Sequence, residues 1–278
     1  MPTDHARFAR ALAFKALHER AGLFIIPNPW DAGSAKLLTG LGFEALATTS
    51  AGLAYSLGKA DGQVTREELL QHARSITSVT HLPVAADLEG GFGDDPAICA
   101  ETILKAAETG LVGGSIEDAS RDPANPIYPL PFSVERVKAA VAAARSLPFP
   151  FTLTARAENY LHGRADLQDT ILRLKAFAEA GADVLFAPGL RTRQEIESAV
   201  NAVRPKPLNV IMAFPGADLT LDELAGLGVK RVSLGSSLAR AAYGAFFRAA
   251  EEVRQQGSFT YASSTIPFAE INTLLRNR

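Results

Sequence analysis

The stretch "VAADLEGGFGDDP", residues 84–96, contains the pattern from which the fold can be worked out. A run of small apolar residues stops at Asp87, and a second acid, Glu89, follows after one leucine. Three glycines then fall within four positions, so the backbone is free to turn sharply there. A buried strand that ends in carboxylates and a flexible loop is typical of parallel α/β proteins, whose functional residues lie beyond the carboxyl ends of the strands.

Short apolar segments of this kind recur along the whole chain and alternate with longer segments whose apolar residues are spaced three and four apart. We expect strands at Leu23–Ile26, Ala45–Thr48, Val84–Asp87, Gly114–Glu117, Phe151–Ala155, Val184–Ala187, Leu208–Met212 and Arg231–Leu234. Eight strand–helix units typically fill about 250 residues, and the chain has 278. The alternation therefore predicts an α/β protein with a TIM-type (β/α)8 barrel.

The ends of the helical segments support this prediction. Capping boxes open three of them, at Thr65 with Glu68, Thr192 with Glu195 and Thr220 with Glu223. A glycine ends four of them just before an apolar strand, at Gly42, Gly110, Gly181 and Gly228. The first three of these glycines lie about 70 residues apart, which is the length of two strand–helix units.

The composition argues against several classes of protein. Hydrophobic residues make up 47% of the chain, which is an ordinary fraction for a globular protein. Its formal net charge is −2 and it has no basic run, so a nucleic-acid partner is not expected. No apolar segment approaches the ~20 residues that span a membrane, and the amphipathic N-terminus lacks the apolar core of a signal peptide. The single cysteine, Cys99, rules out an internal disulfide, and we expect a buried thiol and a cytoplasmic location.

No linker or low-complexity tract divides the sequence, so residues 1–278 are expected to form one domain. The segment from about residue 236 to 278 follows the last expected strand, and its tail "SFTYASSTIPFAEINTLL" is not needed to close a barrel. The apolar residues of this tail must be buried somewhere. Packing against a second subunit and folding back onto the same barrel both achieve this, and we favour the second subunit.

Acidic residues follow several of the expected strands and would meet at the mouth of the barrel. Asp87 and Glu89 follow the third strand, and Glu117 follows the fourth. Asp61 lies in the loop after the second strand. Carboxylates so close together repel one another unless a cation offsets them, and oxygen donors without a histidine or cysteine cluster favour Mg²⁺, or Mn²⁺ in its place. We expect Asp87 to bind the metal directly, and Glu89 and Glu117 to bind it through water.

Two further features suggest what binds beside the metal. Arg156 follows the fifth expected strand, and a guanidinium pairs bidentately with carboxylate or phosphonate, so we expect an anionic substrate. A salt bridge from Arg156 to Glu117 or Glu158 is the alternative. The segment "TSAG", residues 49–52, offers backbone N–H groups suited to a carboxylate, although a plain turn explains it almost as well.

Four ordered motifs resemble the isocitrate lyase/phosphoenolpyruvate mutase superfamily. They are "TTSAGLAYSLGKADG", "DLEGGFGD", "SIED" and "TARAE", and the resemblance covers nearly the whole chain. It implies a Mg²⁺-dependent barrel that makes or breaks C–C or P–C bonds next to a 2-oxo acid, through a metal-stabilised enolate. It also implies that the eighth helix is swapped onto a neighbouring barrel in a homodimer or homotetramer.

The resemblance assigns roles residue by residue. It makes Asp87 the direct metal ligand and Glu117 the water-bridged acid, while Glu89 stands where the mutases carry aspartate. Asp61 matches an acid near the metal waters. Arg156 matches the arginine that holds the anionic end of the substrate. Catalytic roles are therefore expected for Asp61, Glu117 and Arg156.

The substrate contacts are assigned in the same way. Ser50, Ala51 and Gly52 match the loop that binds the carboxylate of the 2-oxo acid, and Asp87 and Arg156 would also contact the substrate. Asn209 resembles an asparagine of the methylisocitrate lyase branch. Trp30 lies after the first expected strand, at the mouth, where no motif fixes its role.

One segment departs from the superfamily pattern. In the lyase branch a cysteine after the fourth strand acts as general acid, but "EDASRDPANPIYPLPF", residues 117–132, contains no cysteine, lysine or histidine. The lysine of the mutase loop is missing as well. We therefore expect weak isocitrate cleavage beside oxaloacetate decarboxylation, with Tyr128 as the first candidate for the acid if that expectation fails.

Three functions remain open. The first is a Mg²⁺-dependent lyase acting on a 2-oxo acid or its adduct, by oxaloacetate decarboxylation or (methyl)isocitrate-type cleavage. The second is a mutase or hydrolase for the P–C bond of a phosphonate. The third is a barrel that binds 2-oxo acids without turnover. A Schiff-base aldolase is not expected, because Lys59 is the one lysine in an active-face loop and Asp61 would hold it charged.

Overall fold

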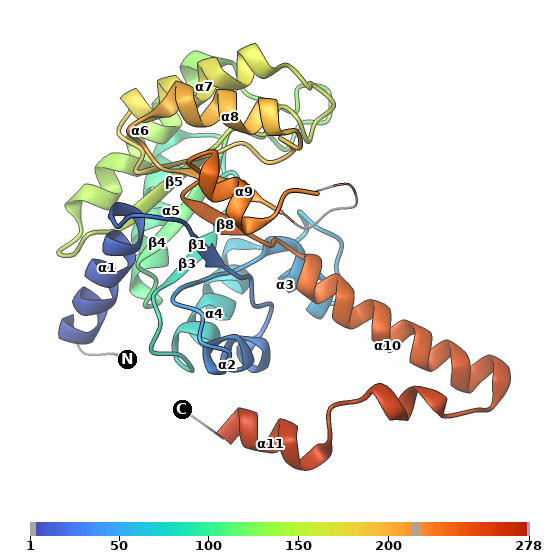
Figure 1. The fold of residues 1–278 in the computed structure, drawn as a ribbon. Coiled ribbons are helices and arrows are strands. Elements are labelled where there is room, and N and C mark those ends of the chain that lie inside the picture. Colours follow the sequence, from blue (N-terminus) through green and yellow to red (C-terminus); the bar gives the residue numbers. More distant parts are fainter. Residues whose placement is uncertain (1–3, 213–215, 217, 277–278) are drawn as a thin grey trace.

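The computed structural model describes residues 4–212, 216 and 218–276 and forms a nearly closed barrel of strands surrounded by helices (Figure 1). The strands are β1 (Phe24–Ile26), β2 (Leu46–Ala47), β3 (Val84–Asp87), β4 (Gly113–Glu117), β5 (Thr152–Arg156), β6 (Val184–Phe186), β7 (Leu208–Ile211) and β8 (Arg231–Ser233). Every expected strand is present, and no end differs by more than one residue. The predicted (β/α)8 architecture is confirmed.

Helices lie between and around the strands, and most of them cover the outside of the barrel. They are α1 (Asp4–Glu19), α2 (Ala32–Gly40), α3 (Ser50–Ser56), α4 (Arg66–Thr77), α5 (Pro96–Glu108), α6 (Leu130–Ser146), α7 (Leu167–Glu179), α8 (Arg193–Val203), α9 (Leu221–Gly226), α10 (Ser237–Gln256), the 3-10 helix η1 (Thr260–Ser264) and α11 (Phe268–Arg276). All three capping boxes form, at the starts of α4, α8 and α9. The four helix-ending glycines all have positive φ, as predicted.

All neighbouring strands are parallel, in the order β1-β8-β7-β6-β5-β4-β3-β2. A hydrogen bond from the backbone N–H of Ala47 to the carbonyl of Pro27, at 3.1 Å, links the two ends of this order. The register pairs Glu117 with Arg156, and Arg156 with Phe186, at the carboxyl ends of β4, β5 and β6. These strand ends therefore form one rim, on which side chains distant in sequence meet.

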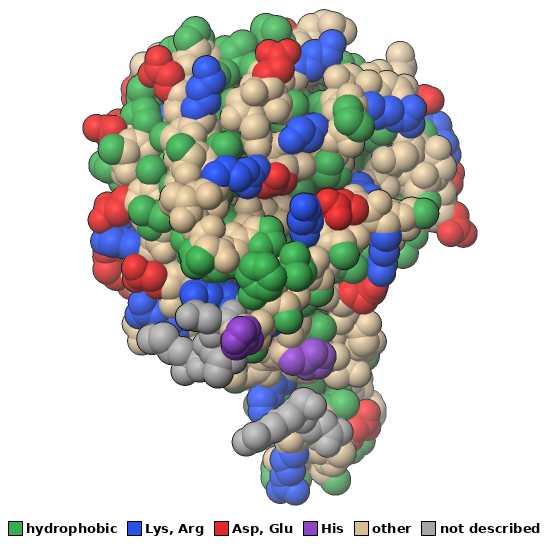
Figure 2. Space-filling model, turned by 90° about the vertical axis from the view of Figure 1, so that its left-hand side faces the viewer, with side chains coloured by type: hydrophobic (Ala, Val, Ile, Leu, Met, Phe, Trp, Pro, Cys, Tyr) green, Lys and Arg blue, Asp and Glu red, His purple; other side chains and the backbone are tan. Residues whose placement is uncertain are grey.

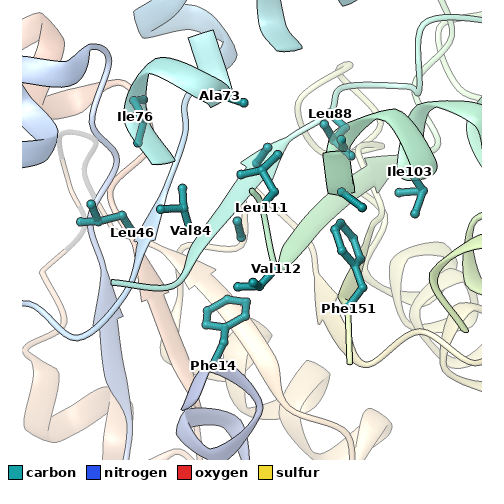
Figure 3. Packing of buried hydrophobic residues seen from close by; sticks show 14 of the residues in the cluster. Phe14, Leu46, Ala73, Ile76, Val84, Leu88, Ile103, Leu111, Val112 and Phe151 are labelled. Atoms are coloured by element: carbon teal, nitrogen blue, oxygen red, sulfur yellow. The ribbon is translucent and has the colours of Figure 1, made fainter. Parts of the chain in front are cut away.

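Helix α1 covers the opposite end of the barrel. Phe14 is fully buried there, with its ring centroid 4.8 Å from that of His18 and 6.5 Å from that of Phe24, both edge-on. Figure 3 shows Phe14 below the strands, with apolar side chains packed between strands and helices around it. A Cβ at Gly113 would lie 2.8 Å from the Phe14 ring, so glycine is required for this close packing. Cys99 is buried and free, as expected.

The C-terminal segment leaves the barrel. Helix α10 projects away from it, and α11 returns to lie beside α2, where Lys36 Nζ donates to the carbonyl of Leu275 at 2.9 Å (Figure 1). The segment thus folds back onto its own chain at α11, while Phe246, Phe247 and Phe268 stay exposed.

Figure 2 shows acidic and basic side chains interspersed on one face of the molecule, in keeping with the small net charge. No helix among the described residues is both long and apolar enough to cross a membrane.

Candidate active site

Arg156, the last residue of β5, lies at the centre of a cluster of carboxylates on the rim. Its Nη1 donates to Asp87 Oδ1 at 2.7 Å, and its Nε donates to Glu158 Oε1 at 2.7 Å. Its Nη2 lies 3.2 Å from Glu117 Oε2. The guanidinium carbon is 5.3 Å from the centre of the Phe186 ring. One cation is therefore shared by three carboxylates, and both salt bridges considered as alternatives from the sequence are present.

Asp87 is held in place from three sides. Its Oδ2 accepts a hydrogen bond from Ser50 Oγ at 3.0 Å, and its Oδ1 accepts from the backbone N–H of Glu89 at 3.2 Å. Its own backbone N–H donates to Thr48 Oγ1 at 3.1 Å. These contacts fix the carboxylate at the end of β3 beside Arg156, so Asp87, Ser50 and Arg156 lie together at the barrel mouth, where the sequence placed them. The metal-binding and substrate-binding roles expected for them stay predictions.

Glu89 and Asp61 add charge to the same site. Glu89 has a φ of 48°, its Oε2 is 3.8 Å from Arg121 Nη2, and its Oε1 is buried without a hydrogen-bond partner among the described residues. Burial, reinforced by the charge of Asp87, raises the pKa of Glu89 to about 7. The pKa of Asp61 is raised by the same two causes.

The donor set of this cluster fits a divalent cation. Two arginines, Arg156 and Arg121, face the carboxylates of Asp61, Asp87, Glu89, Glu117 and Glu158. Burial raises the pKa of Glu117 well above its ordinary range, and it raises that of Glu158 to about 7. No three acidic, histidine or cysteine side chains of the described ranges converge as direct ligands of one ion. Mg²⁺ does not require that, because it commonly binds one or two carboxylates and several waters.

Two spaces that share the lining residues Arg156 and Leu161 lie at the site. A hollow of about 520 Å³ at the rim is lined by Ser50, Asp61, Glu89, Glu117 and Arg156, among others, together with Ser120 and Arg121 of the loop after β4. A narrower shaft of about 120 Å³ continues into the barrel and shares Arg156 with the hollow. The hollow is large enough for a small organic acid.

The predicted carboxylate loop begins α3. Thr49 caps this helix by accepting from the backbone N–H of Gly52 at 3.2 Å, and Ser50 and Ala51 are its first residues. A Cβ at Gly52 would lie 2.9 Å from Trp30 Cβ, so Gly52 lets the Trp30 loop pack closely against α3. Trp30 does not line the hollow or the shaft, and its carbonyl accepts from His72 Nε2 at 2.8 Å.

Asn209 lies deeper than the rim. It is buried inside the barrel, where its Nδ2 donates to Ser233 Oγ at 3.0 Å and its Oδ1 accepts from Arg231 Nε at 2.8 Å. It lines the shaft but not the hollow. A ligand would reach it only from within the shaft.

Sequence reasoning missed Arg136, which supports the glycine-rich loop after β3. This α6 side chain is 1% exposed, and it donates to the backbone carbonyls of Gly90, Gly93 and Asp94. Its guanidinium carbon also stacks 4.5 Å from the centre of the Tyr128 ring. An arginine on the apolar face of a helix was the available signal, although nothing local in the sequence identifies its partners.

Replacing Arg136 with methionine is expected to destabilise the protein by about 3 kcal/mol or more, because three buried carbonyls lose their donor. The change in the urea midpoint measures this loss. Arg193→Met, at an exposed arginine paired with Glu223, is the control and should cost about 1 kcal/mol or less. Equal effects of the two substitutions would contradict the role given to Arg136.

The structure is therefore a TIM-type barrel whose carboxyl-terminal rim gathers carboxylates around a buried arginine. The family model described as phosphoenolpyruvate phosphomutase matches residues 14–254. The chain therefore belongs to the phosphoenolpyruvate phosphomutase family, within the phosphoenolpyruvate mutase/isocitrate lyase superfamily, and the resemblance identified from its motifs is confirmed.

Relatives with named activities match most of the chain. It is 30% identical to the 2-methylisocitrate lyase of Escherichia coli K12, over 88% of this chain and 85% of that protein. It is 30% identical to the oxaloacetate decarboxylase of Paraburkholderia xenovorans LB400, over 85% of this chain and 77% of that protein.

Solved structures of related proteins are also similar to this chain. A candidate lyase/mutase from Burkholderia cenocepacia J2315 is 57% identical, with a TM-score of 0.96 over 99% of this chain and 98% of that one. Oxaloacetate acetylhydrolase with bound oxalate and 2,3-dimethylmalate lyase are each 25% identical over 96% of this chain and 94% of theirs, with TM-scores of 0.86 and 0.85.

Proposed function

We propose that the protein is a Mg²⁺-dependent carbon–carbon lyase acting on a 2-oxo acid or its adduct. The observation that carries the proposal is the rim cluster, in which Arg156 joins Asp87 and Glu117 beside the unpartnered Oε1 of Glu89. The named relatives support the reaction class, since they are lyases, a decarboxylase and a hydrolase named for small organic acids.

Each side chain has a definite task in this proposal. Asp87 would hold Mg²⁺ or Mn²⁺ directly, and Glu89 and Glu117 would hold it through water; when bound, the cation supplies Lewis-acid polarisation of the 2-oxo group. Arg156 orients the anionic end of the substrate, and Ser50 keeps the Asp87 carboxylate in place. Without the cation, burial and the charge of Asp87 raise the pKa of Glu89 to about 7, and a cation beside it favours its charged form.

Cation binding is expected to strengthen as the pH rises through 7. Glu89 and Glu158 have pKa values raised to about 7 from 4.5, so the folded protein holds protons there that the unfolded chain has lost. These groups stabilise the fold below about pH 5, and their contribution is lost as the pH rises through 7. A cation offsets that loss, so the rise in Tm on adding Mg²⁺ should be larger at pH 8 than at pH 5.5. A rise independent of pH would contradict the assignment.

A P–C bond enzyme is the second candidate, because the family is named for a phosphomutase and Arg156 suits a phosphonate equally well. The loop after β4 argues against it, since residues 117–132 offer no lysine. A barrel that binds 2-oxo acids without turnover is the third candidate.

One substrate panel separates these functions. The purified protein is given oxaloacetate, 2-methylisocitrate, isocitrate, 2,3-dimethylmalate and phosphonopyruvate with Mg²⁺, and the products are identified by proton and phosphorus NMR. The lyase predicts cleavage of at least one carbon acid. Turnover of phosphonopyruvate alone would favour the P–C enzyme, and oxalate binding without any turnover would favour the binding barrel.

Oxaloacetate decarboxylation is expected to exceed isocitrate cleavage by about 10²-fold in kcat/KM, because the second reaction needs a general acid that the loop lacks. We do not expect Tyr128 to fill that role, because its hydroxyl donates to Asp94 Oδ1 at 2.5 Å and burial raises its pKa to about 12. Tyr128→Phe should leave both rates within about twofold of the unaltered protein. Efficient isocitrate cleavage that is lost in Tyr128→Phe would show that Tyr128 is the general acid.

We also propose that the protein is a homodimer or homotetramer in which α10 and α11 pack against a neighbouring barrel. The support is the exposure of Phe246, Phe247, Phe259 and Phe268 on this projecting segment, the last of them 85% exposed. Light scattering with size-exclusion chromatography distinguishes this assembly from a monomer.

A further inference from the structure

Arg231 is a charged side chain inside the barrel that the proposed reaction does not use. It is the first residue of β8 and is 6% exposed. Its Nε donates to Asn209 Oδ1 at 2.8 Å and its Nη2 to Thr154 Oγ1 at 3.0 Å, while its Nη1 lies 3.3 Å from His18 Nε2. No carboxylate in the described ranges forms an ion pair with it, and burial lowers its pKa to about 9.

His18 does not supply the missing negative charge. Its Nδ1 lies 2.8 Å from the carbonyl of Phe14, so this nitrogen carries the proton, and Nε2 is left to accept from Arg231. Burial and the charge of Arg231 lower the pKa of His18 to about 3, so the ring is neutral at ordinary pH. The group of side chains around Arg231 therefore has a net positive charge.

A buried charge without a counter-charge is costly, and proteins normally pair it. The other buried arginines follow that rule or are surrounded by oxygen acceptors. Arg173 bonds to Asp118 and Asp169, and Arg136 binds three carbonyl oxygens. Arg231 has two neutral oxygens and one ring nitrogen, and these use three of its five N–H donors.

The space beside Arg231 is suited to an anion. Arg231, Thr154 and Ser233 line the shaft of about 120 Å³, which is large enough for a small ion and a few waters. Thr154 Oγ1 accepts from Arg231, and Ser233 Oγ accepts from Asn209, so both hydroxyl protons remain available to donate. The carboxylate that also lines the shaft, Asp87, is the last residue of β3 and lies at its rim end. Beside Arg231, a guanidinium and two hydroxyl donors attract an anion and repel a metal cation.

We propose that the barrel interior is a binding site for a small anion, held by Arg231 with the hydroxyls of Thr154 and Ser233. The anion is either a free halide ion or a carboxylate of a ligand that enters through the mouth. We include the ligand carboxylate because Thr154 lies close below the expected substrate anchor. It is two residues before Arg156 on β5, about 7 Å deeper in the same shaft. The proposal does not depend on the reaction, because binding is measured without turnover.

Thermal unfolding in chloride, bromide and formate tests the site, with HEPES, a bulky sulfonate that carries no carboxylate, keeping the ionic strength constant. The unaltered protein should show a saturable rise in Tm with the small anions, and Arg231→Met should lose it. Arg193→Met, at an exposed arginine paired with Glu223, is the control and should keep it. The absence of a saturable rise in the unaltered protein, or its persistence in Arg231→Met, would overturn the proposal.

A bromide-soaked crystal of the unaltered protein gives a second test that does not depend on the variant folding. An anomalous peak beside the Arg231 guanidinium is expected, and a barrel interior without one would refute a halide-accessible site. Competition then distinguishes the sources. Chloride that weakens oxalate binding indicates a ligand carboxylate on Arg231, whereas chloride and oxalate that bind independently indicate a separate ion.

Discussion

Arg156→Ala is expected to lower kcat/KM for oxaloacetate by about 10²–10⁴-fold, corresponding to the 3–5 kcal/mol typical of breaking a buried charged contact. In the proposed reaction, the substitution removes the anchor for the anionic end of the substrate. It also leaves Asp87, Glu117 and Glu158 without the guanidinium that they share. Pyruvate release by a coupled assay measures the rate, and thermal unfolding measures the accompanying loss of stability.

Two further variants distinguish the loss of the substrate anchor from the loss of a positive charge in general. Arg156→Lys keeps the charge but cannot form the fork, so it should recover part of the stability and little of the rate. Arg193→Ala removes an exposed arginine paired with Glu223. It should change the rate by no more than about twofold and the stability by no more than about 1 kcal/mol. An Arg156→Ala protein that retains activity within tenfold would place the substrate elsewhere.

Asp87→Asn is the second large effect expected. Asparagine preserves the size of the side chain but removes the charge that would bind the cation directly, so activity should fall by about 10²–10³-fold. The rise in Tm that Mg²⁺ gives the unaltered protein should disappear as well. Activity and calorimetric titration with Mg²⁺ are measured on the same preparation.

Asp95→Ala is the matched control in the same loop. Asp95 caps α5 by accepting from the backbone N–H of Ala97 at 2.8 Å, so its loss should cost about 1 kcal/mol of stability and leave Mg²⁺ binding intact. If Asp87→Asn binds Mg²⁺ as tightly as Asp95→Ala does, Asp87 is not the metal ligand.

The strands and the rim residues could be predicted because both depend on local signals. Apolar runs, capping boxes and helix-ending glycines act within a few residues, and parallel strands necessarily bring their carboxyl ends to one edge. Asp87 and Arg156 therefore met as expected, although they are 69 positions apart.

Side-chain partners across the fold could not be predicted in this way. The link from Arg136 to Gly90 spans 46 positions and depends on how α6 packs beside α5. The predicted partner of Lys59 was wrong: its Nζ binds Glu68 at 2.5 Å, because the capping box of α4 fixes Glu68 beside it. The depth of Asn209 inside the barrel likewise follows from the strand register.

The central claim is that a divalent cation on the rim carboxylates drives cleavage of a 2-oxo acid. Its most direct test is the rate of oxaloacetate decarboxylation with Mg²⁺, after chelation with EDTA, and after Mg²⁺ is restored, each corrected for an enzyme-free blank at the same free Mg²⁺. The account predicts a rate well above the blank that EDTA abolishes and Mg²⁺ restores. A rate above the blank that persists in EDTA, or no rate above the blank with Mg²⁺ for any acid of the panel, would contradict it.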